Sequence, residues 1–115
     1  MTTTVGIGAV TGVTAGEVLA AIDAVLPPGA GNVRLATLDV RAVEPGVASA
    51  AAARGWPVVG HPATRLATVP VPSPSPRVAE LVGTASVAEA AALLGGGALV
   101  VGKTTVGRVT VAVAA

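Results

Sequence analysis

Three charged residues, Asp39, Arg41 and Glu44, lie close together in the sequence. Arginine carries a planar fork of donors that can bind a carboxylate through two parallel hydrogen bonds. The two acids can orient that guanidinium as a supporting shell, or one of them can act as a base that activates water. These residue types could therefore bind a carboxylate, with Asp39 and Glu44 as candidate catalytic residues. Alternatively, Arg41 is solvated or pairs with one of the acids.

A glycine-rich turn near the N-terminus is a second candidate. Gly6, Gly8 and Gly12 precede a stretch with helical periodicity, in a spacing one residue longer than the G-x-G-x-x-G of dinucleotide-binding turns. The glycines can instead permit close packing and a turn with positive φ. Alternatively, the helix that follows can bind an anion, carboxylate or phosphate, at its N-terminus.

Glu17 and Glu89 can be explained as helix-capping residues rather than ligand contacts. Thr14 and Glu17 have the spacing of a capping box, and so do Ser86 and Glu89. His61 is interpreted as a surface residue. A lone histidine and the absence of cysteine exclude a histidine or thiolate metal cluster, so we expect neither a metal site nor a cofactor.

The composition limits the class of protein. Of 115 residues, 52% are hydrophobic and 11% are charged, which argues against disorder. A net charge of +1 and a single aromatic residue argue against nucleic-acid binding. The N-terminus lacks a basic signal-peptide region, and glycines 95–97 interrupt the longest apolar run, so we expect a cytoplasmic protein without a membrane span.

Strand-like and helix-like segments alternate along most of the chain. We expect an α/β fold: one domain over residues 1–115, with three layers, a mixed β-sheet flanked by helices, and a C-terminal β-hairpin that turns within GKTTVG. The expected strands are 5–9, 33–40, 56–60, 98–101 and 108–113. The expected helices are 15–26, 44–54, 76–81 and 86–94, with one helical turn within 61–66 and a proline-rich loop at 69–76.

Four stretches together resemble one known family. They are VGIGAVTGVTAGEVLAAI from Val5, LATLDVRAVEPGV from Leu35, VPVPSPSPRVAELVGTASVAEAAAL from Val69, and LVVGKTTVGRVTVAVA from Leu99. In this order they are similar to the motifs of the CobE/CbiG C-terminal domain family of cobalamin biosynthesis. The resemblance spans nearly the whole chain.

Two positions depart from the family pattern. Ala9 occupies a position where many members carry cysteine, so no thiol chemistry carries over. Arg41 replaces the usual lysine, which preserves the charge but removes a side chain that could transfer a proton.

The resemblance implies a stand-alone CobE-like protein that binds or carries a precorrin or corrinoid intermediate. Such ligands are apolar macrocycles with acetate and propionate groups, which an aliphatic slot with a few fixed donors would suit. The glycine turn would form one wall of the pocket and the proline-rich loop the opposing rim. The implied ligand-binding residues are Gly6, Gly8, Gly12, Asp39, Arg41, Glu44, Ser86, Glu89 and Lys103.

Two alternatives stay open. CbiG-type proteins open a lactone on a cobalt-precorrin and release acetaldehyde, so this chain could be such a hydrolase, with Asp39 or Glu44 as the base. Because the composition is rich in alanine and valine, the chain could instead be a module that docks to another enzyme of the pathway.

Overall fold

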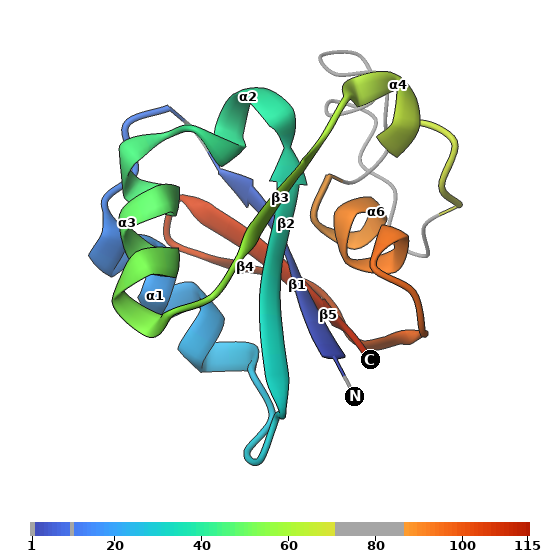
Figure 1. Ribbon diagram of the computed structural model, residues 1–115, viewed down its shortest axis with the longest axis horizontal. Coiled ribbons are helices and arrows are strands. Elements are labelled where there is room, and N and C mark those ends of the chain that lie inside the picture. The colour runs from blue at the N-terminus through green and yellow to red at the C-terminus, as the bar shows by residue number, and fades with distance from the viewer. Residues whose placement is uncertain (1, 10, 71–86) are drawn as a thin grey trace.

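The strands form one twisted sheet with a parallel half and an antiparallel half (Figure 1). The computed structural model describes residues 2–9, 11–70 and 87–115. Within them the strand order is β3-β2-β1-β5-β4. The parallel strands are β1 (Thr2–Ala9), β2 (Asn32–Leu38) and β3 (Val58–His61), and the C-terminal hairpin consists of β4 (Leu99–Val106) and β5 (Val109–Ala114), with β5 antiparallel to β1.

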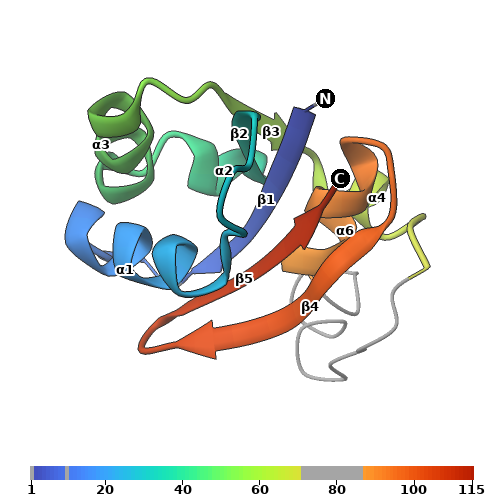
Figure 2. The same cartoon turned by 90° about the horizontal axis from the view of Figure 1, so that it is seen from below.

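Helices cover both faces of the sheet (Figure 2). One face carries α1 (Ala15–Val25) and α3 (Pro45–Arg54), and the other carries α4 (Ala63–Leu66) and α6 (Val87–Leu94). The short α2 (Asp39–Ala42) follows β2 and packs beside β3. The expected three-layer α/β fold with a mixed sheet and a C-terminal hairpin is confirmed.

The alternation of side chains along β1 explains why both faces need a helical layer. Val5 and Ile7 point to the face of α1 and α3, where they pack with Ile22 and Val47 in the larger core. Intervening residues face α6, and Gly6 is one of them. Both faces of the central strands are buried, and the buried hydroxyls of Thr4 and Thr37 on them form hydrogen bonds.

Local signals set several helix ends as expected. Thr14 and Glu17 form the predicted capping box at the start of α1. Pro45 occupies the first turn of α3, and Gly55 ends that helix with a left-handed φ of 68°.

Several predicted strand boundaries are wrong. β1 begins at Thr2 instead of residue 5, and β3 covers Val58–His61 instead of residues 56–60. β2 ends at Leu38, and residues 39–40 belong to α2, because the chain turns at the edge of the sheet where the buried run ends. The first strand of the hairpin is longer than the expected 98–101, since β4 continues through most of GKTTVG to Val106, and the turn falls at the last residue of that segment, Gly107, where φ is +59°. The expected helix 76–81 and most of the proline-rich loop lie outside the described residues.

Candidate functional site

The segments that follow β1 and β2 meet at one edge of the sheet. β1 and β2 are parallel neighbours, so their carboxyl ends point the same way and the following segments leave side by side. One is the turn at residues 11–14 and the other is α2. In open α/β sheets this edge is where ligands bind. We call the contact region of Thr11, Arg41 and Glu44 the arginine cluster.

Arg41 joins the two segments. Its Nη1 donates to Thr11 Oγ1 at 2.8 Å and to Glu44 Oε1 at 3.1 Å. The side chains of Arg41 and Glu44 are 30% and 17% exposed, so the guanidinium is held in place and still accessible. An ordered, accessible guanidinium of this kind can bind a carboxylate of a ligand.

Asp39 is placed differently from Glu44. Its Oδ1 accepts the backbone N–H of Val40 at 2.7 Å, at the start of α2. Within the described part of the chain, no hydrogen bond or ion pair joins Asp39 to Arg41. The structure thus brings Arg41 and Glu44 into contact, as the spacing suggested, and the Asp39 carboxylate takes no part in that pair's hydrogen bonds.

The glycine turn is fixed from the other side by the C-terminal hairpin. Arg108 donates to both carboxylate oxygens of Glu17, at 2.8 and 2.5 Å, and to the carbonyl oxygen of Gly12 at 3.3 Å. The hydrogen bonds from Arg108 lower the pKa of Glu17 to about 2, with a contribution from the N-terminal cap at Thr14. Gly12 has a φ of +87°, which favours glycine.

Gly6 and Gly8 lie under α6 rather than beside an open turn. A Cβ on Gly6 would stand 1.8 Å from the carbonyl oxygen of Ala88, so only glycine lets α6 approach β1 this closely. A Cβ on Gly8 would meet Val87 at 3.8 Å, an ordinary contact. Of the readings left open for these glycines, the structure supports close packing for Gly6 and positive φ only for Gly12.

Glu89 and Lys103 belong to a second region, between α6 and β4. Glu89 is fully buried, and its Oε2 accepts the backbone N–H of Lys103 at 3.0 Å. This N–H lies where the β4–β5 register shifts, between Val101 and Thr104, so the carboxylate satisfies a donor at an irregularity of the ladder. The Lys103 residue itself is exposed. Ser86 lies outside the described residues, and its capping box with Glu89 stays a prediction.

Sequence reasoning missed Thr11, Arg108 and Gly46. Thr11 orients Arg41, and Arg108 fixes the glycine turn from a position 91 residues beyond Glu17. A Cβ on Gly46 would stand 2.0 Å from the carbonyl oxygen of Val13, so this glycine lets α3 pack against the turn. No local pattern marks these residues, because each acts on a segment distant in the sequence.

The described residues contain neither a candidate membrane-spanning helix nor a candidate metal-binding group. Among them, no helix is both long and apolar enough to cross a membrane. The same residues contain no group of three or more histidine, aspartate or glutamate side chains that could hold a metal ion.

The fold and the arginine cluster define a small α/β protein with a charged pair, Arg41 and Glu44, beside the carboxyl ends of parallel strands. The family model "Cobalamin synthesis G C-terminus" matches residues 3–114, and the chain belongs to this family. It is a cobalamin biosynthesis protein of the CobE/CbiG C-terminal family, which confirms the resemblance seen in the four motifs.

Two solved structures are similar to this chain. A crystal structure of CobE, a protein from the cobalamin (vitamin B12) biosynthetic pathway, is 31% identical with a TM-score of 0.85, covering 97% of this chain and 88% of that one. The cobalamin biosynthesis protein chiG from Agrobacterium tumefaciens is 32% identical with a TM-score of 0.69, covering 97% and 96%. A comparison with curated proteins gave no match.

Proposed function

We propose that this chain binds a carboxylate-bearing corrinoid intermediate of cobalamin biosynthesis and does not itself convert it. Family membership supplies the pathway. The single observation that carries the proposal is Arg41, which two acceptors hold at the carboxyl edge of the sheet while its side chain stays partly exposed. Its remaining donors suit an acetate or propionate group of the ligand.

Apolar surface beside Arg41 supports the same proposal. Val40 and Val43 flank Arg41 and are 57% and 78% exposed. Aliphatic side chains next to a fixed guanidinium suit a ligand with an apolar ring and an anionic fringe. Lys103 would add a second positive charge near α6. Its ammonium group attracts a carboxylate but does not form the two parallel hydrogen bonds of a guanidinium.

The test is a titration of the purified protein with hydrogenobyrinic acid, a corrin that carries free carboxylates. Binding is monitored through the absorbance of the corrin. We expect Arg41→Ala to weaken binding about 10- to 100-fold, the range for loss of a charge-assisted hydrogen bond. Arg41→Lys keeps the positive charge but lacks the planar guanidinium that can form two parallel hydrogen bonds, so this variant should recover only part of the affinity. Circular dichroism confirms that each variant is folded. Equal affinity in all three proteins would reject Arg41 as a ligand contact.

A hydrolase remains the second candidate because the Asp39 carboxylate is not paired with Arg41. A carboxylate in that position could activate water for lactone opening. Incubation with a lactone-bearing cobalt-precorrin, with products analysed by mass spectrometry, separates the two functions. Unchanged ligand supports a binding protein. A mass change with acetaldehyde release that disappears in Asp39→Asn would replace the carrier proposal with a hydrolase.

The third hypothesis, a docking module, also draws on the exposed Val40 and Val43. It would take precedence if the protein bound no corrinoid but co-purified from its host with another enzyme of the pathway. Loss of that co-purification in Val43→Ser, with the fold retained, would assign the contact to α2.

A further inference from the structure

Among the described residues, the helices leave a strip along the edge strand β3 partly uncovered on the face of α6. In the β2–β3 register, Ala36 pairs with Val59 and Leu38 pairs with His61, so these four side chains lie on the face of α6. α6 packs on β1, β2, β5 and β4, and β3 at the sheet edge lies beyond it. Val59 accordingly remains 37% exposed.

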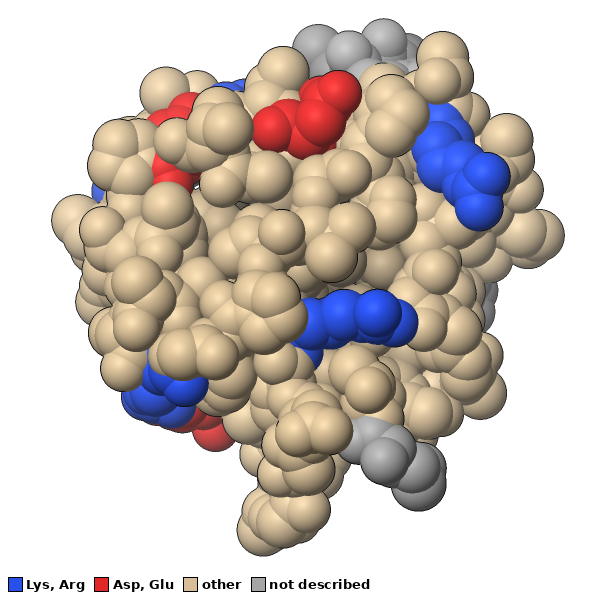
Figure 3. Space-filling view, viewed as in Figure 1, with Lys and Arg blue, Asp and Glu red and all other residues tan. Residues whose placement is uncertain are grey.

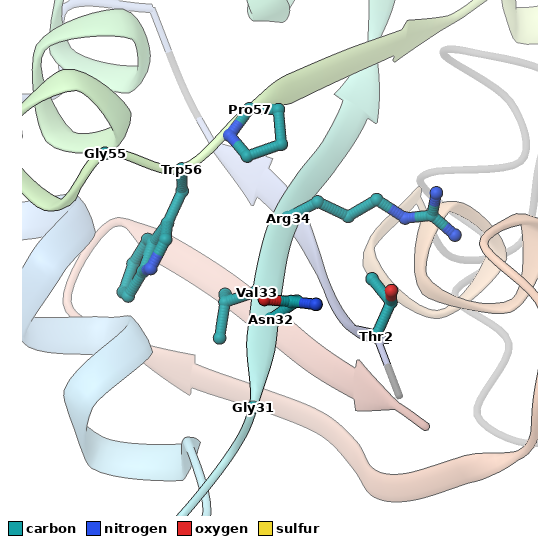
Figure 4. A pocket seen from close by; sticks show the side chains of 8 residues that line it. All are labelled: Thr2, Gly31, Asn32, Val33, Arg34, Gly55, Trp56 and Pro57. Atoms are coloured by element: carbon teal, nitrogen blue, oxygen red, sulfur yellow. The ribbon is translucent and has the colours of Figure 1, made fainter.

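Arg34 stands at one end of this strip in a fixed position. Its Nε donates to Thr4 Oγ1 at 3.1 Å and its Nη2 to the carbonyl oxygen of Gly95 at 2.5 Å. Figure 4 shows its guanidinium directed toward α6, while Trp56 points to the opposite side of β2. Arg34 also lines an open hollow of about 520 Å³ at the start of β2, so the residue borders solvent-accessible space.

His61 and Arg65 continue the strip toward α4. Burial lowers the pKa of His61, and the positive charges of Arg65 and then Arg34 lower it further, which places both guanidiniums within electrostatic reach of the imidazole. Among the described residues, no acid on a neighbouring element forms an ion pair with Arg34 or Arg65. The carboxylate of Glu89, on α6, binds the backbone of β4, and Asp39, on α2, packs over the opposite face of β3.

Neither Arg34 nor Arg65 forms an ion pair with a carboxylate among residues 2–9, 11–70 and 87–115. By contrast, Arg41, Arg54 and Arg108 each have an acidic partner there. Figure 3 shows basic side chains near the middle of the view and over α4, with uncharged surface between them and an acidic patch above. Positive charges that no ion pair neutralises attract an anion.

We propose that Arg34, His61 and Arg65, the basic strip, bind carboxylate groups of an anionic ligand on the sheet face opposite α1 and α3. The identity of that ligand as a corrinoid rests on the proposed function. The chemistry of the strip does not, because any molecule with two or more carboxylates could span its donors. Arg34 acts as the fixed donor, and the exposed Arg65 adapts to the ligand.

Because His61 is the single histidine of the chain, ligand binding to the strip can be followed through its NMR signal. The pKa of the His61 imidazole is followed by NMR, first in the free protein and then with saturating hydrogenobyrinic acid. A carboxylate bound to the strip should raise this pKa by about 0.5–1 unit, because an opposite charge favours the protonated ring. By reciprocity, affinity should rise as the pH falls from 8 to 6, and His61→Gln should abolish that dependence.

Arg65→Gln is the informative variant, because Arg65 is exposed and its loss should not unfold the chain. We expect it to weaken binding about three- to tenfold, between the effects of an exposed ion pair and a charge-assisted hydrogen bond. Arg54→Gln removes the same charge from the opposite side of the molecule and serves as the matched control, with unchanged affinity expected. Cobinamide, whose side chains are amides, should not shift the His61 pKa.

The outcomes separate this inference from the proposed function. If hydrogenobyrinic acid binds but Arg65→Gln has no effect and the His61 pKa stays constant, the strip is rejected while the carrier function stands. If no corrinoid binds, citrate replaces it as the polycarboxylate. A rise in the His61 pKa with citrate that is reduced in Arg65→Gln then supports the strip alone, and no rise overturns it.

Discussion

At the scale of single residues, Gly6 controls how closely two layers approach. An added Cβ would stand 1.8 Å from the backbone oxygen of Ala88, and backbone cannot rotate away as a flexible side chain could. We expect Gly6→Ala to lower the free energy of unfolding by about 1–3 kcal/mol or more, the usual effect of overpacking. Urea denaturation followed by circular dichroism measures this change.

The matched control for Gly6 is Gly8→Ala in the same strand. Its Cβ would meet Val87 at 3.8 Å, so no atom has to move. We expect the unfolding free energy of this variant to stay within about 1 kcal/mol of the original protein, since alanine only reduces the freedom of the unfolded chain. Equal destabilisation by both substitutions would contradict a special role for Gly6.

At the scale of elements, the contact between Glu17 and Arg108 ties the β4–β5 hairpin to the start of α1. Because the pKa of Glu17 falls from 4.5 to about 2 on folding, the folded chain binds its proton less tightly than the unfolded chain. The resulting stabilisation is complete above about pH 4.5 and is lost as the pH falls toward 2. Unfolding measured between pH 2 and 6 should show this loss, and Glu17→Gln should flatten it.

A double-mutant cycle assigns that pH dependence to the contact itself. Arg108→Gln should flatten the profile as Glu17→Gln does, except for the part of the pKa shift that the cap at Thr14 supplies. The double variant should then add little. Additive effects of the two substitutions would show that Arg108 and Glu17 act independently, and the hairpin would not hold the glycine turn through this pair.

At the scale of the whole molecule, the two helical layers share one sheet, so they should unfold together. Trp56 packs against the core under α1 and α3, whereas His61 lies on the side of α6. We expect Trp56 fluorescence, the His61 NMR signal and far-ultraviolet circular dichroism to report the same urea midpoint. A lower midpoint for His61 alone would show that the layer of α4 and α6 separates before the rest unfolds.

The sequence alone predicted the layers, the hairpin and most helix ends. Those features depend on neighbours a few residues apart, as in the capping box of Thr14 and Glu17 or the left-handed end at Gly55. The pairing of Arg41 with Glu44 was also predictable, since only three positions separate them in the chain, which turns between α2 and α3. The family could be predicted because its motifs are continuous in the chain.

Only the tertiary structure decided the long-range partners of the charged groups. Thr11 meets Arg41 because β1 and β2 are parallel neighbours, and Arg108 meets Glu17 because the hairpin pairs with β1. The partner of Glu89 depends on a register shift in β4 that its sequence does not mark. Each contact joins segments far apart in the chain, so composition and periodicity carry no information about it, whereas the packing of the sheet fixes it.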